Sequence, residues 1–142
     1  MPEGGRVGFD PWLHTVAEVE RWGQVLEGSG ISMVQCANLV DRIWEDQPAP
    51  PMQPVKAHPL EFAGETAEAK CARLAEDLRT AGHRATVITL PDSIMWLLNI
   101  RGADIARNPV AQGFAILHDD ARVDLFMAES KLSAVRDHLG ES

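Results

Sequence analysis

A proline-rich stretch near the middle of the chain most constrains what this sequence can fold into. Residues 45–59 contain five of the nine prolines of the 142-residue chain, at positions 48, 50, 51, 54 and 59. Proline lacks an amide hydrogen and its ring restricts φ, so neither a helix interior nor a central strand runs through such a segment. We therefore predict an extended linker here, and with it a boundary between two domains.

The sequence before the linker has the pattern of one strand–helix–strand unit. Residues 6–10 and 31–36 are typical of short strands. Between them, Thr15 followed by Glu18 matches a capping box, which predicts the start of a helix. Residues 38–44 predict a further short helix, whose apolar side chains at positions 39, 40, 43 and 44 face inward.

The sequence after the linker alternates between helix and strand patterns. The predicted elements are a helix over residues 66–81, a buried strand over 85–90, a short helix over 91–100, a hairpin of strands over 112–117 and 122–127, and a final helix over 132–139. This order predicts an α/β fold with a small mixed β-sheet flanked by helices. In the first of these helices Cys71 and Leu74 belong to the apolar face, and Lys70 is expected on the opposite, charged face.

The composition argues against several classes of protein. Hydrophobic residues make up 45% of the chain, enough for a core, and the formal net charge is −8. This acidity argues against binding to nucleic-acid phosphates or to anionic membranes. No apolar run approaches the roughly 20 residues that span a bilayer. The N-terminus lacks the apolar stretch of a signal peptide, so we predict a cytoplasmic protein.

The residue types that most often carry chemistry form no recognisable active site. None of the five histidines pairs with another at i, i+4, and neither an H-E-x-x-H nor a G-x-S-x-G motif is present. Cys36 and Cys71 do not form a C-x-x-C pair, and we predict that both are buried free thiols. The residues themselves therefore predict neither a catalytic group nor a metal ligand.

A dense apolar segment, residues 91–100, is the best candidate for a functional region. It starts with a proline and an aspartate, which suit the first turn of a helix, and its apolar residues are too closely spaced for a helix with a solvent face. A buried helix would deliver Trp96, Asn99 and Arg101 to one corner of the domain. On residue types alone, a core tryptophan, a capping asparagine and a surface arginine remain the simpler interpretation.

Separated motifs in this order resemble those of aminopeptidase P, the Xaa-Pro aminopeptidases of the creatinase/prolidase superfamily. Residues 92–110 carry every fixed position of the pattern D-x-I-x-W-L-L-N-x-R-G-x-D-x-x-x-N-P-V. Residues 38–48 are similar to N-L-V-D-x-I-W-x-D-x-P, and residues 8–11 to G-x-D-P. Gly64 and Lys70 resemble the G-x-x-x-x-x-K spacing with which the second domain of the family opens.

The resemblance implies a creatinase N-terminal-domain-like, ribonuclease H-like fold. It places residues 1–53 at the end of a first creatinase-N-type domain together with the linker, and residues 54–142 in a second such domain. In that family a separate, C-terminal pita-bread domain binds two divalent metal ions, usually manganese, and removes the N-terminal residue from peptides with proline in second position. That catalytic domain has no counterpart here, so we expect an inactive fragment of a metallopeptidase.

The resemblance also implies the partners. The expected ones are the catalytic domain of the same parent chain, a second subunit of a homodimer, and proline-containing peptides in the parent. We hypothesise that Trp96, Asn99 or Arg101 faces the catalytic domain and helps to close the peptide site. In the alternative, Trp96 packs beneath the sheet and Arg101 merely holds the Asp104 loop. Two other functions stay open: a stand-alone α/β binding module, and the N-terminal region of a creatinase-like amidinohydrolase. The coding sequence beyond residue 142 would distinguish them.

Overall fold

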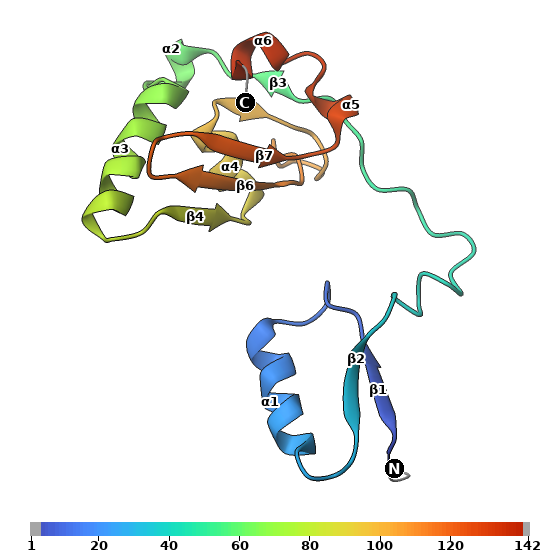
Figure 1. The fold of residues 1–142 in the computed structure, drawn as a ribbon. Helices are drawn as coiled ribbons and strands as arrows, with labels where there is room; N and C mark the ends of the chain where they lie inside the picture. The colour runs from blue at the N-terminus through green and yellow to red at the C-terminus, as the bar shows by residue number, and fades with distance from the viewer. Residues whose placement is uncertain (1–3, 141–142) are drawn as a thin grey trace. The chain divides into compact units, whose positions relative to one another are not determined.

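The computed structural model describes residues 4–140, which form two compact units (Figure 1). Residues 1–49 belong to the N-terminal unit and residues 50–142 to the C-terminal unit. Residues 47–55, which contain four of the prolines expected in the linker, have no regular secondary structure. Within the described residues, no helix combines the length and the apolar content needed to cross a membrane.

The N-terminal unit is a strand–helix–strand unit, as its sequence predicts. Strand β1 (Arg6–Phe9) pairs in parallel with β2 (Ser32–Gln35), and α1 (Val16–Leu26) connects them. The predicted capping box is present at the start of α1. The amide of Glu18 donates to the Thr15 hydroxyl at 3.2 Å, and the Thr15 amide donates to the Glu18 carboxylate at 2.9 Å. These bonds satisfy donors that the first helical turn would otherwise leave unpaired.

The helix predicted over residues 38–44 is absent, and the prediction of its inward face was wrong. The segment consists of turns, and Leu39, Val40 and Ile43 are 63%, 56% and 78% exposed. An Asn38 side-chain oxygen accepts the Val40 amide at 2.9 Å, which favours a turn. So short a helix needs tertiary packing to repay its nucleation, and one helix on a two-stranded sheet gives its apolar face no layer to pack against.

The C-terminal unit contains the remaining helices and strands. Its elements are β3 (Lys56–Ala57), α2 (Leu60–Ala63), α3 (Ala67–Thr80), β4 (Ala85–Ile88), α4 (Pro91–Leu97), β5 (Ile100–Arg101), β6 (Phe114–His118), β7 (Val123–Phe126), α5 (Glu129–Leu132) and α6 (Arg136–Leu139). Strands β4, β6 and β7 form an antiparallel sheet in that order, and β3 pairs antiparallel with β5. The α/β class and the β6–β7 hairpin are confirmed. In place of one mixed sheet, the parallel pair β1–β2 and the antiparallel pairs form separate small sheets.

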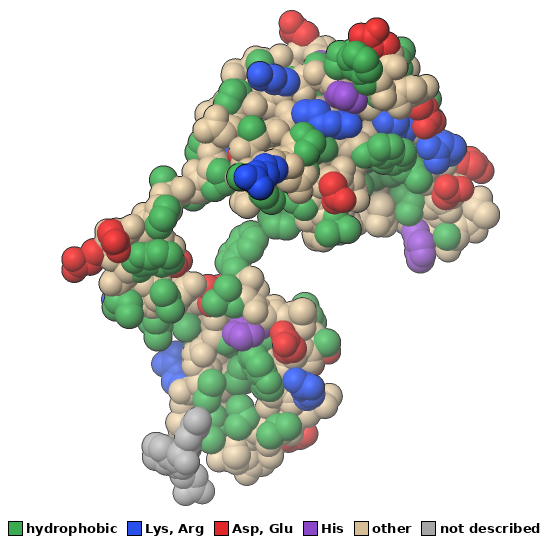
Figure 2. All heavy atoms as spheres, turned by 180° about the vertical axis from the view of Figure 1, so that it is seen from behind, with side chains coloured by type: hydrophobic (Ala, Val, Ile, Leu, Met, Phe, Trp, Pro, Cys, Tyr) green, Lys and Arg blue, Asp and Glu red, His purple; other side chains and the backbone are tan. Residues whose placement is uncertain are grey.

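The core of the C-terminal unit lies where α3 and α4 pack against β6. On β6, Ala115 and Leu117 are buried. Phe114, on the other face of the same strand, is 42% exposed. From the helices, Cys71 and Ile94 complete the apolar cluster, so the prediction of a buried Cys71 thiol is confirmed. On the surface, acidic, basic and apolar side chains are interspersed (Figure 2).

Three further predictions differ from the structure. Strand β4 is an edge strand with Val87 66% exposed, so the expectation of a fully buried strand was wrong. Cys36 is exposed and lies just beyond the end of β2, so the prediction that its thiol is buried was wrong. The single C-terminal helix is divided into α5 and α6. Between them, Val135 is 1% exposed, and its burial turns the chain toward the core.

Candidate functional site

The turn between α4 and β5 forms the candidate site. Helix α4 begins at Pro91 and places Ile94, Met95 and Leu97 in the core, where they are at most 2% exposed. Trp96 lies between two of these buried residues and points the other way, with 45% of its surface exposed. The alternative in which Trp96 packs beneath the sheet is therefore wrong. The indole is a large apolar group on the surface, anchored through a buried backbone.

Asn99 shapes the turn itself. Its φ of 51° is left-handed, a conformation that asparagine tolerates better than most residues and that often ends helices. The residue is 4% exposed, and its side-chain amide donates to the Glu65 carbonyl at 2.8 Å. Its own carbonyl accepts the His58 amide at 2.7 Å, next to β3. The side chain and the main chain of Asn99 are both hydrogen-bonded within the domain, so this residue supports the corner.

Lys70 lies beneath this turn, and the prediction of a solvent-facing lysine was wrong. It is 1% exposed, and its ammonium donates to the Trp96 carbonyl at 2.7 Å and to the Asn99 side-chain oxygen at 2.6 Å. It also lies 4.6 Å from the centroid of the Trp96 ring. The Trp96 carbonyl at the end of α4 accepts a long bond from the Asn99 amide, at 3.4 Å, and lies at the negative end of the helix dipole, which a cation stabilises. The one sequence signal for Lys70 was its spacing from Gly64 in the family pattern.

The surroundings of Lys70 also set its protonation. Burial lowers the pKa of the Lys70 ammonium below its ordinary value. The Glu65 charge acts against this shift, and the Arg101 charge adds to it, because like charges disfavour the protonated form. The corner therefore holds two cations close together, and both donate hydrogen bonds to neutral oxygens.

Arg101 on β5 is half-buried and braces the same helix. Its guanidinium donates to the Ile100 carbonyl at 2.8 Å and to the Met95 carbonyl at 3.2 Å. The alternative in which Arg101 holds the Asp104 loop is wrong, because another residue pairs with Asp104. Arg101 lines an open hollow of about 180 Å³. The other lining residues are Asp92, Met95, Trp96, Asn108, Pro109 and Val110.

Asp104 binds Lys131 of α5. Its side chain is fully buried, that of Lys131 is 5% exposed, and the Lys131 ammonium lies 2.5 Å from the Asp104 Oδ2. The Gln112 amide donates to the same oxygen at 2.7 Å. Burial acts to raise the pKa of Asp104, but the hydrogen bond and charge of Lys131, with the backbone hydrogen bonds of Gln112 and Gln53, outweigh it and leave the pKa below its ordinary value. The pair ties the loop after β5 to the C-terminal helices.

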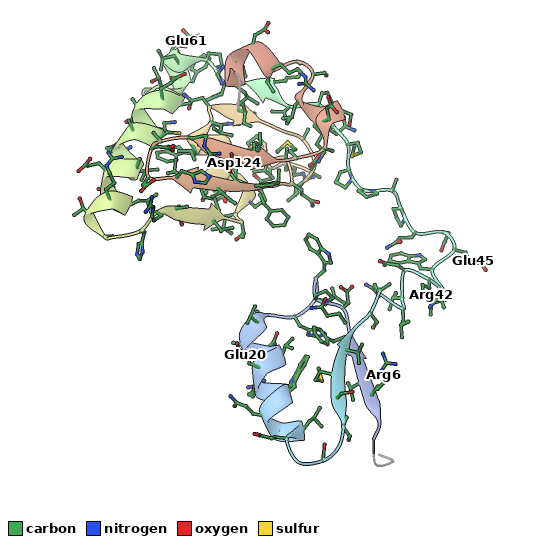
Figure 3. The ribbon with its side chains drawn as sticks, in the orientation of Figure 1. Arg6, Glu20, Arg42, Glu45, Glu61 and Asp124 are labelled. Atoms are coloured by element: carbon green, nitrogen blue, oxygen red, sulfur yellow. The ribbon has the colours of Figure 1, made fainter. Side chains whose placement is uncertain are left out.

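A second group of titratable residues lies on the outer face of the β6–β7 hairpin. Asp124 on β7 (Figure 3) accepts from the His118 ring at 2.8 Å and also pairs with Arg122. The hydrogen bond from His118, followed by that from Arg122, lowers the pKa of Asp124. This carboxylate is already neutralised by its neighbours on the hairpin, which is the structural role expected of a charged cross-strand pair.

The donor set of a metal centre is missing from residues 4–140. No group of three or more histidine, cysteine, aspartate or glutamate side chains in this range is placed so that it could hold a metal ion. The described residues therefore do not fit the two-metal site that the family resemblance implies for a catalytic domain. The features that this domain offers instead are an ordered aromatic corner and an adjacent hollow.

Comparisons with known proteins agree with the motif resemblance. Residues 46–142 match the Creatinase/Prolidase N-terminal domain family. The Coccidioides posadasii (strain C735) protein "Probable Xaa-Pro aminopeptidase P" is 44% identical over an alignment of 144 residues that covers 98% of this chain and 22% of that protein. "Aminopeptidase P1" of Arabidopsis thaliana is 37% identical over 134 residues, 94% of this chain and 21% of that protein. The chain thus spans less than a quarter of the length of these relatives.

A solved structure shares the fold. The X-prolyl aminopeptidase of Caenorhabditis elegans, described as a cytosolic enzyme with a di-nuclear active site, has a TM-score of 0.82 and 35% identity to this chain. The match covers 97% of this chain and 23% of that protein. The expected creatinase-type fold is thereby confirmed. The chain belongs to the creatinase/prolidase N-terminal domain family, with the aminopeptidase P proteins as its relatives.

Proposed function

We propose that this chain is a non-catalytic N-terminal region of a cytoplasmic Xaa-Pro aminopeptidase. The parent protein would remove the N-terminal residue from peptides with proline in second position. Its pita-bread catalytic domain would bind two divalent metal ions, manganese by the family resemblance. Two findings support the proposal: the relatives named as aminopeptidases match nearly all of this chain over less than a quarter of their own length, and no metal-binding group is assembled in residues 4–140.

Within that parent, we propose that the α4–β5 corner contacts the catalytic domain and helps to close the peptide site. The observation that carries this is the contrast in exposure along one turn. Trp96 is 45% exposed, whereas Met95 and Leu97 on either side are 2% and 1% exposed. A large aromatic group held on the surface by a rigid, buried backbone is the usual anchor of a protein contact.

The same geometry separates the roles of the three predicted site residues. Trp96 and Arg101 line the hollow and are accessible to a partner. Asn99 is 4% exposed and is occupied by Lys70 and by the Glu65 carbonyl, so its role is to hold the turn. The partner surface lies on the catalytic domain of the same chain or, if the parent is a homodimer, on that of the second subunit.

The test uses a full-length aminopeptidase that contains this segment. Trp96→Ala and Arg101→Ala are compared with Val87→Ala, which shortens an exposed apolar side chain on the edge strand β4 (66% exposed, against 45% for Trp96). Loss of a contact at the peptide site should lower kcat/KM for peptides with proline in second position about tenfold, which corresponds to about 1.4 kcal/mol. The melting temperature of the two corner variants should stay close to that of the control. A lower melting temperature with normal turnover would sink the proposal.

A further inference from the structure

Lys70 is a buried cation, and its ammonium forms no ion pair with a carboxylate of the described residues. Among the described residues, its ammonium contacts the Trp96 carbonyl, the Asn99 side-chain oxygen and the Trp96 ring. The second buried lysine, Lys131, differs in that it pairs with Asp104 at 2.5 Å. A buried charge with no carboxylate in contact is unfavourable, and an apolar side chain of similar length would avoid that penalty. The bonds to the end of α4 offset part of the penalty, and the contact with the Trp96 ring is one that an apolar side chain could not make as a cation does.

The contacts of the Lys70 ammonium converge on the main chain and the ring of one residue. Nζ lies 2.7 Å from the Trp96 carbonyl oxygen and 4.6 Å from the centroid of the Trp96 ring. The third contact, to Asn99, holds the turn that directly follows. Lys70 therefore fixes the backbone and the side chain of Trp96 at the same time.

Core packing alone cannot orient the Trp96 ring. The neighbouring side chains of Met95 and Leu97 fix the backbone of α4, but 45% of Trp96 itself is exposed, so packing covers only part of its surface. A cation over the ring favours the stacked arrangement by about two- to thirtyfold, with the larger value for a desolvated contact such as this one. That preference is large enough to decide which rotamer an exposed indole adopts.

We propose that Lys70 is the positioning residue of Trp96: it holds the indole over the hollow lined by Arg101 and Pro109, ready for contact. That the partner is the catalytic domain rests on the function proposed above. A side chain that is ordered before binding loses less conformational freedom when it binds, so an oriented indole makes a stronger contact than a mobile one. Lys70 thus acts on the contact through Trp96 without touching the partner.

The test measures directly how firmly the Trp96 ring is held in one orientation. The other three tryptophans, Trp12, Trp22 and Trp44, lie in the N-terminal unit, and phenylalanine at all three leaves Trp96 as the single indole. In this background, Lys70→Met should lose more than half of the near-ultraviolet circular dichroism of Trp96. The acrylamide quenching constant should rise about twofold, while the far-ultraviolet spectrum stays the same.

Lys131→Met is the matched control. It removes the other buried lysine, which the structure places against Asp104 and not against the indole, so it should change stability and leave both Trp96 signals unaltered. Lys70→Arg, which keeps a cation above the ring, should restore part of the dichroism. Unchanged Trp96 signals in a folded Lys70→Met chain, or an equal loss in a folded Lys131→Met chain, would overturn the proposal.

Two further measurements separate the positioning role from the folding of the variant and from the proposed function. If Lys70→Met does not fold, raising the pH of the three-phenylalanine chain removes the Lys70 charge instead. A near-ultraviolet dichroism band of Trp96 that survives until the backbone unfolds refutes the positioning role. In the full-length enzyme, Lys70→Met should lower kcat/KM in the same direction as expected for Trp96→Ala. A disordered indole with normal peptide turnover would leave the positioning role intact and contradict the proposed function.

Discussion

Replacing Lys131 with methionine tests how strongly the buried Asp104–Lys131 pair holds the C-terminal unit together. The Lys131 and Asp104 side chains are 5% and 0% exposed, so the substitution leaves a carboxylate in a dry site. Its Oδ2 would keep the hydrogen bond from the Gln112 amide, and its Oδ1 has no hydrogen-bond partner among the described residues. Breaking such a pair by removing one member destabilises a protein by about 3–5 kcal/mol.

The carboxylate can escape this penalty by taking up a proton, which limits the loss. With an ordinary aspartate pKa of about 3.9, protonation at pH 7 costs about 4 kcal/mol, and at pH 5 about 1.5 kcal/mol. We therefore expect Lys131→Met to lose about 4 kcal/mol of unfolding free energy at pH 7 and about 1.5 kcal/mol at pH 5. Urea unfolding at both pH values, followed by far-ultraviolet circular dichroism, measures the two losses.

The sign of the pH dependence makes the test sharp. In the natural chain the pKa of Asp104 is lowered, so its contribution is present above the unfolded pKa and is lost as pH falls through the folded one. In Lys131→Met the burial of Asp104 is no longer compensated, its pKa rises, and the variant recovers stability as pH falls toward 4. The double variant Lys131→Met, Asp104→Asn should show neither trend. A loss below about 1 kcal/mol, or one independent of pH, would refute the reasoning.

Two other predictions concern backbone space and the charge of Lys70. Gly102→Ala should cost about 3 kcal/mol or prevent folding, because its Cβ would lie 2.5 Å from the Ala111 amide nitrogen and close to other backbone atoms. The matched Gly23→Ala in α1 meets open space and should raise stability by about 1 kcal/mol, both measured by thermal unfolding. Burial lowers the pKa of Lys70, so between that value and about 10.4 the unfolded chain binds more protons and stability rises with pH. Lys70→Met should lack this alkaline rise, and an identical alkaline profile would count against a buried, charged Lys70.

Local patterns predicted the elements whose signals lie within a few residues. The capping box at Thr15 and Glu18 starts α1, and the turn after β6 produces the hairpin. Both depend on hydrogen bonds between close neighbours in sequence. The strands β3 and β5 escaped prediction because each has two residues, and the partner of each lies more than 40 positions away along the chain.

Part of the candidate site was predictable because its residues are close neighbours in the sequence. The apolar spacing of α4 and its capping asparagine can be read in the sequence, and Trp96, Asn99 and Arg101 do meet at one corner. The sequence did not show which of these side chains is exposed and which is buried. Charge alone places Lys70 on the solvent face of α3, yet the end of α4 offers it acceptors that only the packing of two helices brings within reach.

The sequence by itself determined the helix starts and turns, the α/β order and, through its motifs, the family, because these depend on short-range bonds and on residue identity. Only the tertiary structure decided which polar groups are buried. Lys70 and Lys131 are buried, whereas Trp96 and Ile43 are exposed, contrary to what hydrophobicity predicts for each. The physical reason is that burial of a charge depends on acceptors supplied by distant segments, and burial of an apolar group on whether another layer lies across from it.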